Sequence, residues 1–318
     1  MIMPQADAIV LACPRCHRPF EPSEPDVLCC AADGLTFRRV SGIWRLLLPE
    51  REPYYQQFMR EYESVRKAEG RGSASRDYYQ ALPYRDLSGS WSADWAIRAA
   101  SFDAFVHHAV LPLEKRLGGG LAVADLGSGN GWLSNRMALR GHASAAVDLL
   151  LNEQDGLGCH PYYAAPYLPV QAEFDALPFG GQSFSLVVFN ASFHYSSAYE
   201  RTLQEALRVL KRGGSLVLLD SPIYQDASSG ERMVRERETQ FQQRFGFPSN
   251  SLHSENYLTY ARLKDLAARL KMTMKIVTPR YGPRWLLRRL KARILSQREA
   301  ANFHLVMLTD AGEPSGSA

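Results

Sequence analysis

The sequence lacks the features of membrane-spanning or disordered proteins. Its apolar runs stay well short of the ~18 residues of a membrane span, and the opening segment Met1–Ala12 has neither a basic leader nor a long apolar stretch. Over 318 residues, a hydrophobic fraction of 46% and a charged fraction of 22% are typical of globular proteins with a sizeable core. We therefore expect a cytoplasmic protein without a transmembrane segment.

A charge excess, an internal repeat and scattered cysteines are also lacking. The formal net charge of +4 is too small to indicate nucleic-acid binding by itself. Of the five cysteines, four lie between Cys13 and Cys30, and Cys159 stands alone. In a reducing compartment this clustering favours metal ligation over disulfide bonds.

The domain organisation follows from changes in composition along the chain. The cysteine-containing segment has too few apolar residues for a core of its own, so it needs a cross-link or a bound metal ion to be stable. Helical periodicity over Tyr54–Glu69 is followed by a flexible break over Gly70–Ser75, and a second helical stretch over Ala93–Leu117 ends at a glycine triplet from Gly118. The chain divides into four predicted parts: a zinc-ribbon-like module over 1–49, a helical linker or lid region over 50–117, a main domain over 118–310 and a disordered tail over 311–318.

The main domain alternates short apolar runs with helical segments. The predicted strands are Leu121–Leu126, Ala143–Asp148, Ser185–Asn190, Ser215–Asp220, Thr273–Thr278 and Phe303–Thr309. Helices are predicted over Asn130–Arg140 and Tyr199–Leu210. Apolar strands separated by helices indicate an α/β fold with a parallel sheet covered on both faces.

A glycine-rich loop lies between the first predicted strand and helix of this domain. In Ala124-Asp-Leu-Gly-Ser-Gly-Asn-Gly131 the glycines form a tight turn at which a ligand can approach bare backbone. A dinucleotide-binding fingerprint requires a glycine one position later, where Trp132 stands. Asp148 ends the next strand, where a carboxylate can accept hydrogen bonds from both ribose hydroxyls in either class of enzyme.

The loop, preceded by Asp125, resembles the first motif of class I S-adenosylmethionine-dependent methyltransferases. Three further segments resemble later motifs of this family: Glu173–Phe179, an acidic-x-x-x-Leu-Pro-Phe segment; Phe184–Asn190, with Ser185 in place of the usual Asp; and Glu205–Gly214, a helix and turn before the fifth strand. The resemblance implies a doubly wound, seven-stranded Rossmann-like sheet with a reversed C-terminal hairpin.

The resemblance also implies where S-adenosylmethionine binds. Glu173 is placed to accept from the adenine amino group, with the backbone N–H of Phe174 near the ring, whereas Asp175 is two residues out of register. The residues implied to bind the cofactor are Asp125, Gly127, Ser128, Gly129, Asn130, Gly131, Asp148, Leu149, Glu173, Phe174 and Asn190.

The N-terminal cysteines form two knuckles whose separation is close to that of small zinc ribbons. The segment Leu11–Leu48 resembles the zinc module fused to or partnered with several methyltransferases, except that Asp33 stands where a cysteine or histidine is expected. His17 or Cys29 could take the place of Asp33. The sequence predicts a structural Zn²⁺ held by Cys13, Cys16, Cys30 and Asp33.

Methyl transfer depends mainly on alignment of the two partners in a dry site. If the acceptor must lose a proton, His194 is the best-placed base, just beyond the fourth strand, and Tyr195 is a second candidate. The alternative for both is to shape the pocket. The aromatic segment Tyr78–Phe105 is either a substrate lid or part of the core.

The acceptor is not readable from a motif. The catalytic half resembles the ubiquinone and menaquinone methyltransferases and related enzymes of small metabolites, which implies a small-molecule acceptor. The alternatives are ribosomal RNA, favoured by the zinc module, and a non-catalytic cofactor-binding subunit. Residues 280–298 predict a basic amphipathic helix that could contact a membrane surface, an acidic substrate or RNA, or form a solvated face.

Overall fold

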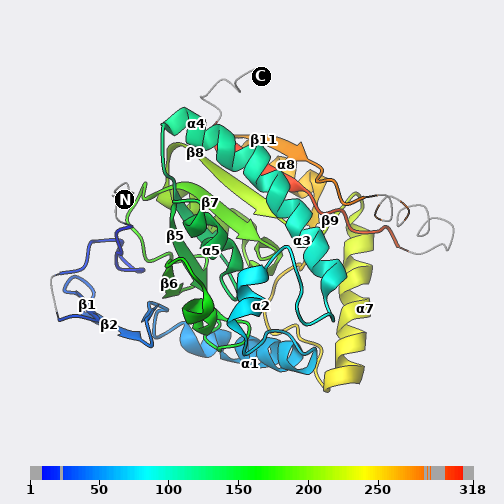
Figure 1. Cartoon of the computed structure of the whole chain (residues 1–318), viewed down its shortest axis with the longest axis horizontal. Helices are drawn as coiled ribbons and strands as arrows, with labels where there is room; N and C mark the ends of the chain where they lie inside the picture. The colour runs from blue at the N-terminus through cyan, green and yellow to red at the C-terminus, as the bar shows by residue number, and fades with distance from the viewer. Residues whose placement is uncertain (1–8, 22–23, 283–284, 286, 288–297, 311–318) are drawn as a thin grey trace.

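The computed structural model describes residues 9–21, 24–282, 285, 287 and 298–310 (Figure 1). The strands are β1 (Val27–Cys30), β2 (Leu35–Val40), β3 (Ile43–Arg45), β4 (Ala122–Leu126), β5 (Ala143–Asp148), β6 (Leu168–Gln171), β7 (Phe184–Asn190), β8 (Leu210–Leu219), β9 (Ile223–Tyr224), β10 (Leu258–Thr259), β11 (Met272–Val277) and β12 (Leu305–Asp310). The helices are α1 (Glu52–Ala68), α2 (Arg76–Ala81), α3 (Ser92–Phe105), α4 (Leu111–Leu117), α5 (Trp132–Leu139), α6 (Tyr199–Val209), α7 (Ala227–Phe245) and α8 (Tyr260–Arg269).

A single sheet with the strand order β1-β2-β3-β6-β5-β4-β7-β8-β12-β11 runs through the molecule. Its last seven strands form the predicted sheet: β6, β5, β4, β7 and β8 pair in parallel, and β12 and β11 form the antiparallel hairpin. The predicted fold class is therefore confirmed. The chain passes from β4 to β5 and β6 on one side, then to β7 and β8 on the other. Ligands bind at such a switch point, outside the carboxyl ends of the strands.

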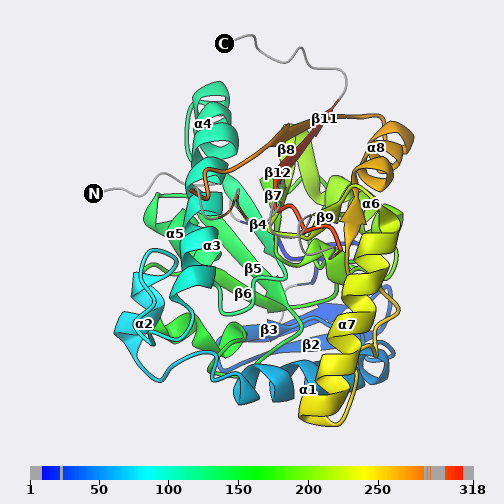
Figure 2. The same ribbon diagram turned by 90° about the vertical axis from the view of Figure 1, so that its right-hand side faces the viewer.

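Both faces of the sheet are covered by helices. All residues of β4 and β7 are buried, which explains why their sequences are mostly apolar on both faces instead of alternating. Ala124 and Leu126 pack in the cluster that includes α6 and α8, whereas Val123 packs in the cluster formed with α3, α4 and α5. Figure 2 shows these two groups of helices on opposite sides of the sheet.

The N-terminal module extends this sheet at the edge opposite the hairpin. Strand β3 pairs in parallel with β6, with Trp44 opposite Val170, and the N–H of Leu46 donates to the carbonyl of Gln171 over 2.9 Å. Phe37, Leu46 and Leu48 are buried in the same cluster as Val170. The small apolar content of the module is thus supplemented by the core of the main domain, an arrangement that the sequence did not predict.

The predicted helices before β4 are observed at the expected positions. The predicted helix Ala93–Leu117 is observed as α3 and α4, joined by one turn of π-helix over Val106–Val110. Pro112 follows this turn and has no N–H to donate to the preceding turn of an α-helix, which accounts for the irregularity. The helix ends at Gly118 in the left-handed conformation, as predicted.

Two predictions fall outside the described residues. Most of the predicted basic helix over 280–298, including Arg284, Arg288, Arg289, Lys291 and Arg293, lies there, and so does the tail over 311–318. Among the residues that are described, none of the helices is both long and apolar enough to cross a bilayer.

Candidate functional site

The glycine loop follows β4 at the switch point. Gly127, Gly129 and Gly131 all have positive φ, and Gly131 lies immediately before the first residue of α5. A Cβ on Gly127, with φ +73°, would lie 2.3 Å from the Cβ of Ser192 and 3.1 Å from the Phe174 ring. Gly127 is therefore required both by its backbone conformation and by the close approach of two neighbouring loops.

Asp148 orients this loop from the end of β5. Its carboxylate accepts hydrogen bonds from the N–H groups of Gly129 and Leu150, at 2.8 and 2.9 Å. Burial raises the pKa of the Asp148 carboxyl to about 6. The side chain lines a cavity together with the glycine loop.

Asp125 lies beneath the loop and is fully buried. One of its carboxylate oxygens accepts from the Ser134 hydroxyl at 2.9 Å, whereas Oδ1 has no hydrogen-bond partner among the described residues. The hydroxyl of Ser128 is likewise unpartnered within the described part of the chain. Burial raises the pKa of the Asp125 carboxyl to about 7. Unpaired buried polar atoms cost stability, so this side of the loop is prepared for a polar partner.

Glu173 follows β6 and is held by two residues of the helical region. Arg51 donates to both carboxylate oxygens, with Nη2 at 2.7 Å from Oε2 and Nε at 2.9 Å from Oε1. The Tyr55 hydroxyl donates to Oε2 at 2.7 Å. Arg51 and Tyr55 lie at the start of α1 outside every recognised motif, and sequence reasoning missed both.

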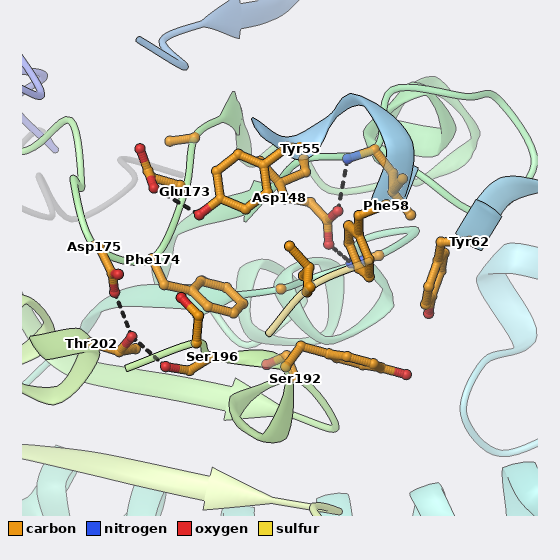
Figure 3. Close-up of a pocket in the computed structure, with 18 of the residues that line it drawn as sticks. Tyr55, Phe58, Tyr62, Asp148, Glu173, Phe174, Asp175, Ser192, Ser196 and Thr202 are labelled. Atoms are coloured by element: carbon orange, nitrogen blue, oxygen red, sulfur yellow. Dashed lines mark hydrogen bonds between the residues drawn. The ribbon is translucent and has the colours of Figure 1, made fainter. Parts of the chain in front are cut away.

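Asp148, Glu173 and Tyr55 share one cavity with the glycine loop at the carboxyl edge of the sheet (Figure 3). Of the predicted cofactor residues, the cavity is lined by Gly127, Gly129, Asp148, Leu149, Glu173 and Phe174. The predicted residues that do not line it are Asp125, Ser128, Asn130, Gly131 and Asn190. Asn130 instead accepts from Tyr163 and from the N–H of Trp132, which supports the start of α5.

Helix α1 covers the cavity. Tyr55, Phe58 and Tyr62 contribute to its lining, and Figure 3 shows Tyr55 and Phe58 on the side opposite Ser192 and Ser196. Asp175 also lines the cavity, but its carboxylate accepts from Thr202.

The aromatic segment Tyr78–Phe105 has a different position. Tyr78, Tyr79 and Trp95 are at most 7% exposed and pack in the core cluster with Trp132. For these three residues the core interpretation is correct and the lid interpretation is wrong.

A second, larger cavity adjoins the first. It measures about 980 Å³ and shares Tyr62, Ala191 and Tyr195 with the first cavity. Both candidate bases, His194 and Tyr195, line it, and Asp220 at the end of β8 lines it too. The two cavities together therefore combine the glycine loop with the residues predicted for chemistry.

The surroundings of His194 make it a weak base. It is buried, and its Nδ1 lies 3.3 Å from the Ser221 hydroxyl. Burial, together with the charges of Arg237 and Arg98, lowers the pKa of His194 to about 3. A histidine with this pKa is neutral throughout the physiological range, but it has little affinity for a proton.

The cysteine knuckles converge within the N-terminal module. One ligand atom from each of Cys13, Cys16, Cys30 and Asp33 lies within 4.8 Å of the others. The Sγ atoms of Cys16 and Cys30 are 3.5 Å apart, and Oδ2 of Asp33 is 3.1 Å from Sγ of Cys13. His17 and Cys29 do not belong to this group among the described residues.

Comparison with known proteins gives a match to one family model. Residues 124–218 match the model described as a methyltransferase domain. The malonyl-[acyl-carrier protein] O-methyltransferases of Erwinia pyrifoliae and Coxiella burnetii are each 33% identical, over 108 and 97 residues that represent 32% and 30% of this chain. The matched region spans only 38% and 32% of the lengths of these curated relatives.

Solved structures include similar chains at low sequence identity. The 1,6-didemethyltoxoflavin-N1-methyltransferase of Burkholderia thailandensis is 15% identical, with a TM-score of 0.47 and coverage of 92% of this chain and 99% of that one. An S-adenosylmethionine-dependent methyltransferase of Mesorhizobium loti is 17% identical, with a TM-score of 0.44 and coverage of 60% and 91%.

Proposed function

We propose that this chain, in which residues 124–218 form a methyltransferase domain, transfers a methyl group from S-adenosylmethionine to a small-molecule acceptor. The observation that carries the proposal is the union of the glycine loop, Asp148 and Glu173 in one cavity with a second polar cavity beside it. The curated relatives support an acceptor group of small size, since they are named as O-methyltransferases of malonyl-[acyl-carrier protein].

The residues that line the first cavity fit the adenosine part of this cofactor. Each carboxylate oxygen of Asp148 accepts one backbone N–H and retains a lone pair for a ribose hydroxyl. Oε1 of Glu173 accepts one bond from Arg51 and retains a lone pair for the adenine amino group.

The chain contributes alignment and exclusion of water. When bound, S-adenosylmethionine supplies a methyl group on a positively charged sulfur; an electron pair of the acceptor forms the new bond to carbon as the carbon–sulfur electrons return to sulfur. Tyr195 lines both cavities and packs against Phe58 and Tyr62, with ring centroids 6.0 Å apart in each pair. We assign Tyr195 to positioning the acceptor, and neutral His194 to shaping its cavity or receiving its proton.

Calorimetry and a transfer assay test this function. The purified full chain is titrated with S-adenosylmethionine and S-adenosylhomocysteine, and is then incubated with labelled donor and pooled small-molecule or RNA acceptors. Micromolar binding and label in a small molecule are expected. Label in RNA would replace the acceptor assignment, binding without transfer would favour the non-catalytic subunit, and absence of binding would overturn the proposal.

For the N-terminal module we propose a structural zinc ion held by Cys13, Cys16, Cys30 and Asp33. In a tetrahedral site, zinc–sulfur bonds of about 2.3 Å place sulfur ligands ~3.8 Å apart, close to the 3.5 Å between Cys16 and Cys30. Three thiolates and a carboxylate are suitable zinc ligands. A four-ligand set leaves no open coordination position, so the ion would stabilise the fold without acting in catalysis.

A further inference from the structure

The second cavity is lined by an unusual number of arginines. Arg66 comes from α1, Arg98 from α3, Arg232 and Arg237 from α7, and Arg298 from the chain before β12. Two acidic residues, Asp220 and Glu236, line the same cavity. Helices α1, α3 and α7, which are distant in sequence, thus contribute an excess of positive charge to one space beside the glycine-loop cavity.

Two of these arginines already have acidic partners. Arg66 pairs with Asp155, and Arg298 pairs with Glu236 at 2.7 Å. Arg98, Arg232 and Arg237 have no carboxylate within salt-bridge distance in the described part of the chain. The positive charge that remains is therefore not neutralised by the protein itself.

Arg237 carries the clearest sign of a missing partner. Its Nε and Nη2 atoms are buried and make no hydrogen bond with any described residue. The ring of Phe241 lies 6.0 Å from its guanidinium carbon. Donors that are withdrawn from water and left unpaired destabilise a structure, and a charged donor does so more than a neutral one. A guanidinium satisfies two such donors at once with a carboxylate or phosphate.

Arg98 and Asp220 place this charge beside the candidate chemistry. The charges of Arg237 and Arg98 both act on His194, and that of Arg98 acts on Asp220. Oδ2 of Asp220 is buried without a partner among the described residues, so it offers an acceptor for a hydroxyl or amine of the same ligand. The shared lining residue Tyr195 joins this space to the glycine-loop cavity.

We propose that the methyl acceptor is a small anion whose carboxylate or phosphate is held by Arg98 and Arg237 between α3 and α7. This inference rests on the proposed methyl transfer and adds the chemical class of its acceptor. A volume of about 980 Å³ suits a small molecule. Arg232 is exposed on α7, the helix that carries Arg237, and its charge increases the attraction for an anion.

The test measures anion binding separately from cofactor binding. The full chain is saturated with S-adenosylhomocysteine and titrated by calorimetry at low salt with malonate, inorganic phosphate and neutral malonamide. Binding of malonate or phosphate, but not of malonamide, is expected, and the anion that binds more tightly identifies the acceptor group. Failure of both anions to bind the cofactor-loaded protein would overturn the acceptor class while leaving the methyltransferase proposal intact.

Variants locate the binding. Arg237→Gln and Arg98→Gln should each lower anion affinity about tenfold or more, with the affinity for S-adenosylhomocysteine unchanged. Arg235→Gln is the matched control, because Arg235 lies on the same helix, pairs with Glu231 and has a side chain 67% exposed. Equal losses in Arg237→Gln and Arg235→Gln would mean a general charge effect and would refute the site. Anion binding by a protein that does not bind the cofactor would instead count against the proposed function.

Discussion

The two adjoining cavities differ in how their polar groups are satisfied. In the glycine-loop cavity, Asp148 accepts two backbone N–H groups, and Glu173 is held by Arg51 and Tyr55. In the arginine-lined cavity, the guanidinium of Arg237 and one oxygen of Asp220 lack partners among the described residues. The first cavity is therefore preorganised by the chain, whereas the second depends on a ligand to complete its hydrogen bonds.

The difference also lies in the elements that build each cavity. The first is lined mostly by residues that follow β4, β5, β6 and β7, and helix α1 covers it. The second is lined by residues of α1, α3 and α7, by residues after β7 and β8, and by residues of the segment before β12. Tyr62, Ala191 and Tyr195 line both cavities, whereas the glycine loop lines only the first, and α3 and α7 line only the second.

The largest expected effect is loss of the preorganised cavity in Gly127→Ala. The added Cβ would lie 2.3 Å from Ser192, so the loops must separate, and cofactor affinity should fall about 100-fold or more. Gly118→Ala is the control, since Gly118 has the same φ of +73° but nothing within 4 Å of its Cβ. Calorimetry with S-adenosylhomocysteine measures both variants. Equal losses would show that backbone strain, and not the close approach, is responsible.

A smaller loss is expected from Asp148→Ala. Removal of the proposed ribose acceptor should cost about 1 to 3 kcal/mol, or roughly ten- to a hundredfold in affinity. Because hydroxyls donate to the ionised carboxylate, affinity in the unaltered protein should fall as the pH drops through about 6, the raised pKa of this group. Asp148→Asn should lose most of that pH dependence. Undiminished binding by a folded Asp148→Ala protein would remove the ribose from this position.

The difference between strand ends and helices also explains which parts of the structure could be predicted from the sequence. Strands β4, β5, β7 and β8 are apolar runs next to recognisable turns, so both they and the residues at their ends could be located. Strand β6 was missed because it has only four residues, one of them Pro169. Helix α7 was missed because it buries only Gly230 and shows little amphipathic pattern.

Residues that reach the two cavities from distant parts of the chain were harder to predict than the sequence motifs. Arg51 precedes α1 by one residue and contacts Glu173 across 122 positions of sequence. Arg237 acquires its position only because α7 lies against the same space as α1 and α3. Neither residue belongs to a local pattern, since each depends on how distant elements pack. Strand-end motifs are local, whereas these contacts are long-range.

Removal of the proposed zinc tests whether the first cavity depends on the N-terminal module. Cys16→Ser should abolish bound zinc, measured by metal analysis, and expose the module to limited proteolysis. Because Arg51 directly follows the module and holds Glu173, we expect a severalfold loss of S-adenosylhomocysteine affinity as well. Cys159→Ser is the control, since that buried cysteine lies outside the cluster. Metal-free protein with a protease-resistant N-terminus would contradict the zinc site.

The smallest expected effect concerns His194, the first of the two candidate bases. An unperturbed histidine base would make turnover fall as the pH drops through about 6.5, and its loss would lower kcat about 10²-fold. Burial and the neighbouring arginines lower the pKa of His194 to about 3, so this group stays neutral between pH 5 and 8 and is a poor proton acceptor. At saturating cofactor, kcat should therefore show no histidine step in that range, and His194→Ala should lower kcat less than tenfold.

The charged groups that face His194 are Arg98 and Arg237, and Asp220 lines the same cavity. An anion bound to the arginines would offset their charge and raise the pKa of His194. A histidine step that appears only with an acidic acceptor would thus sharpen the distinction between the two cavities, whereas a step near pH 6.5 with every acceptor would restore His194 as an ordinary general base.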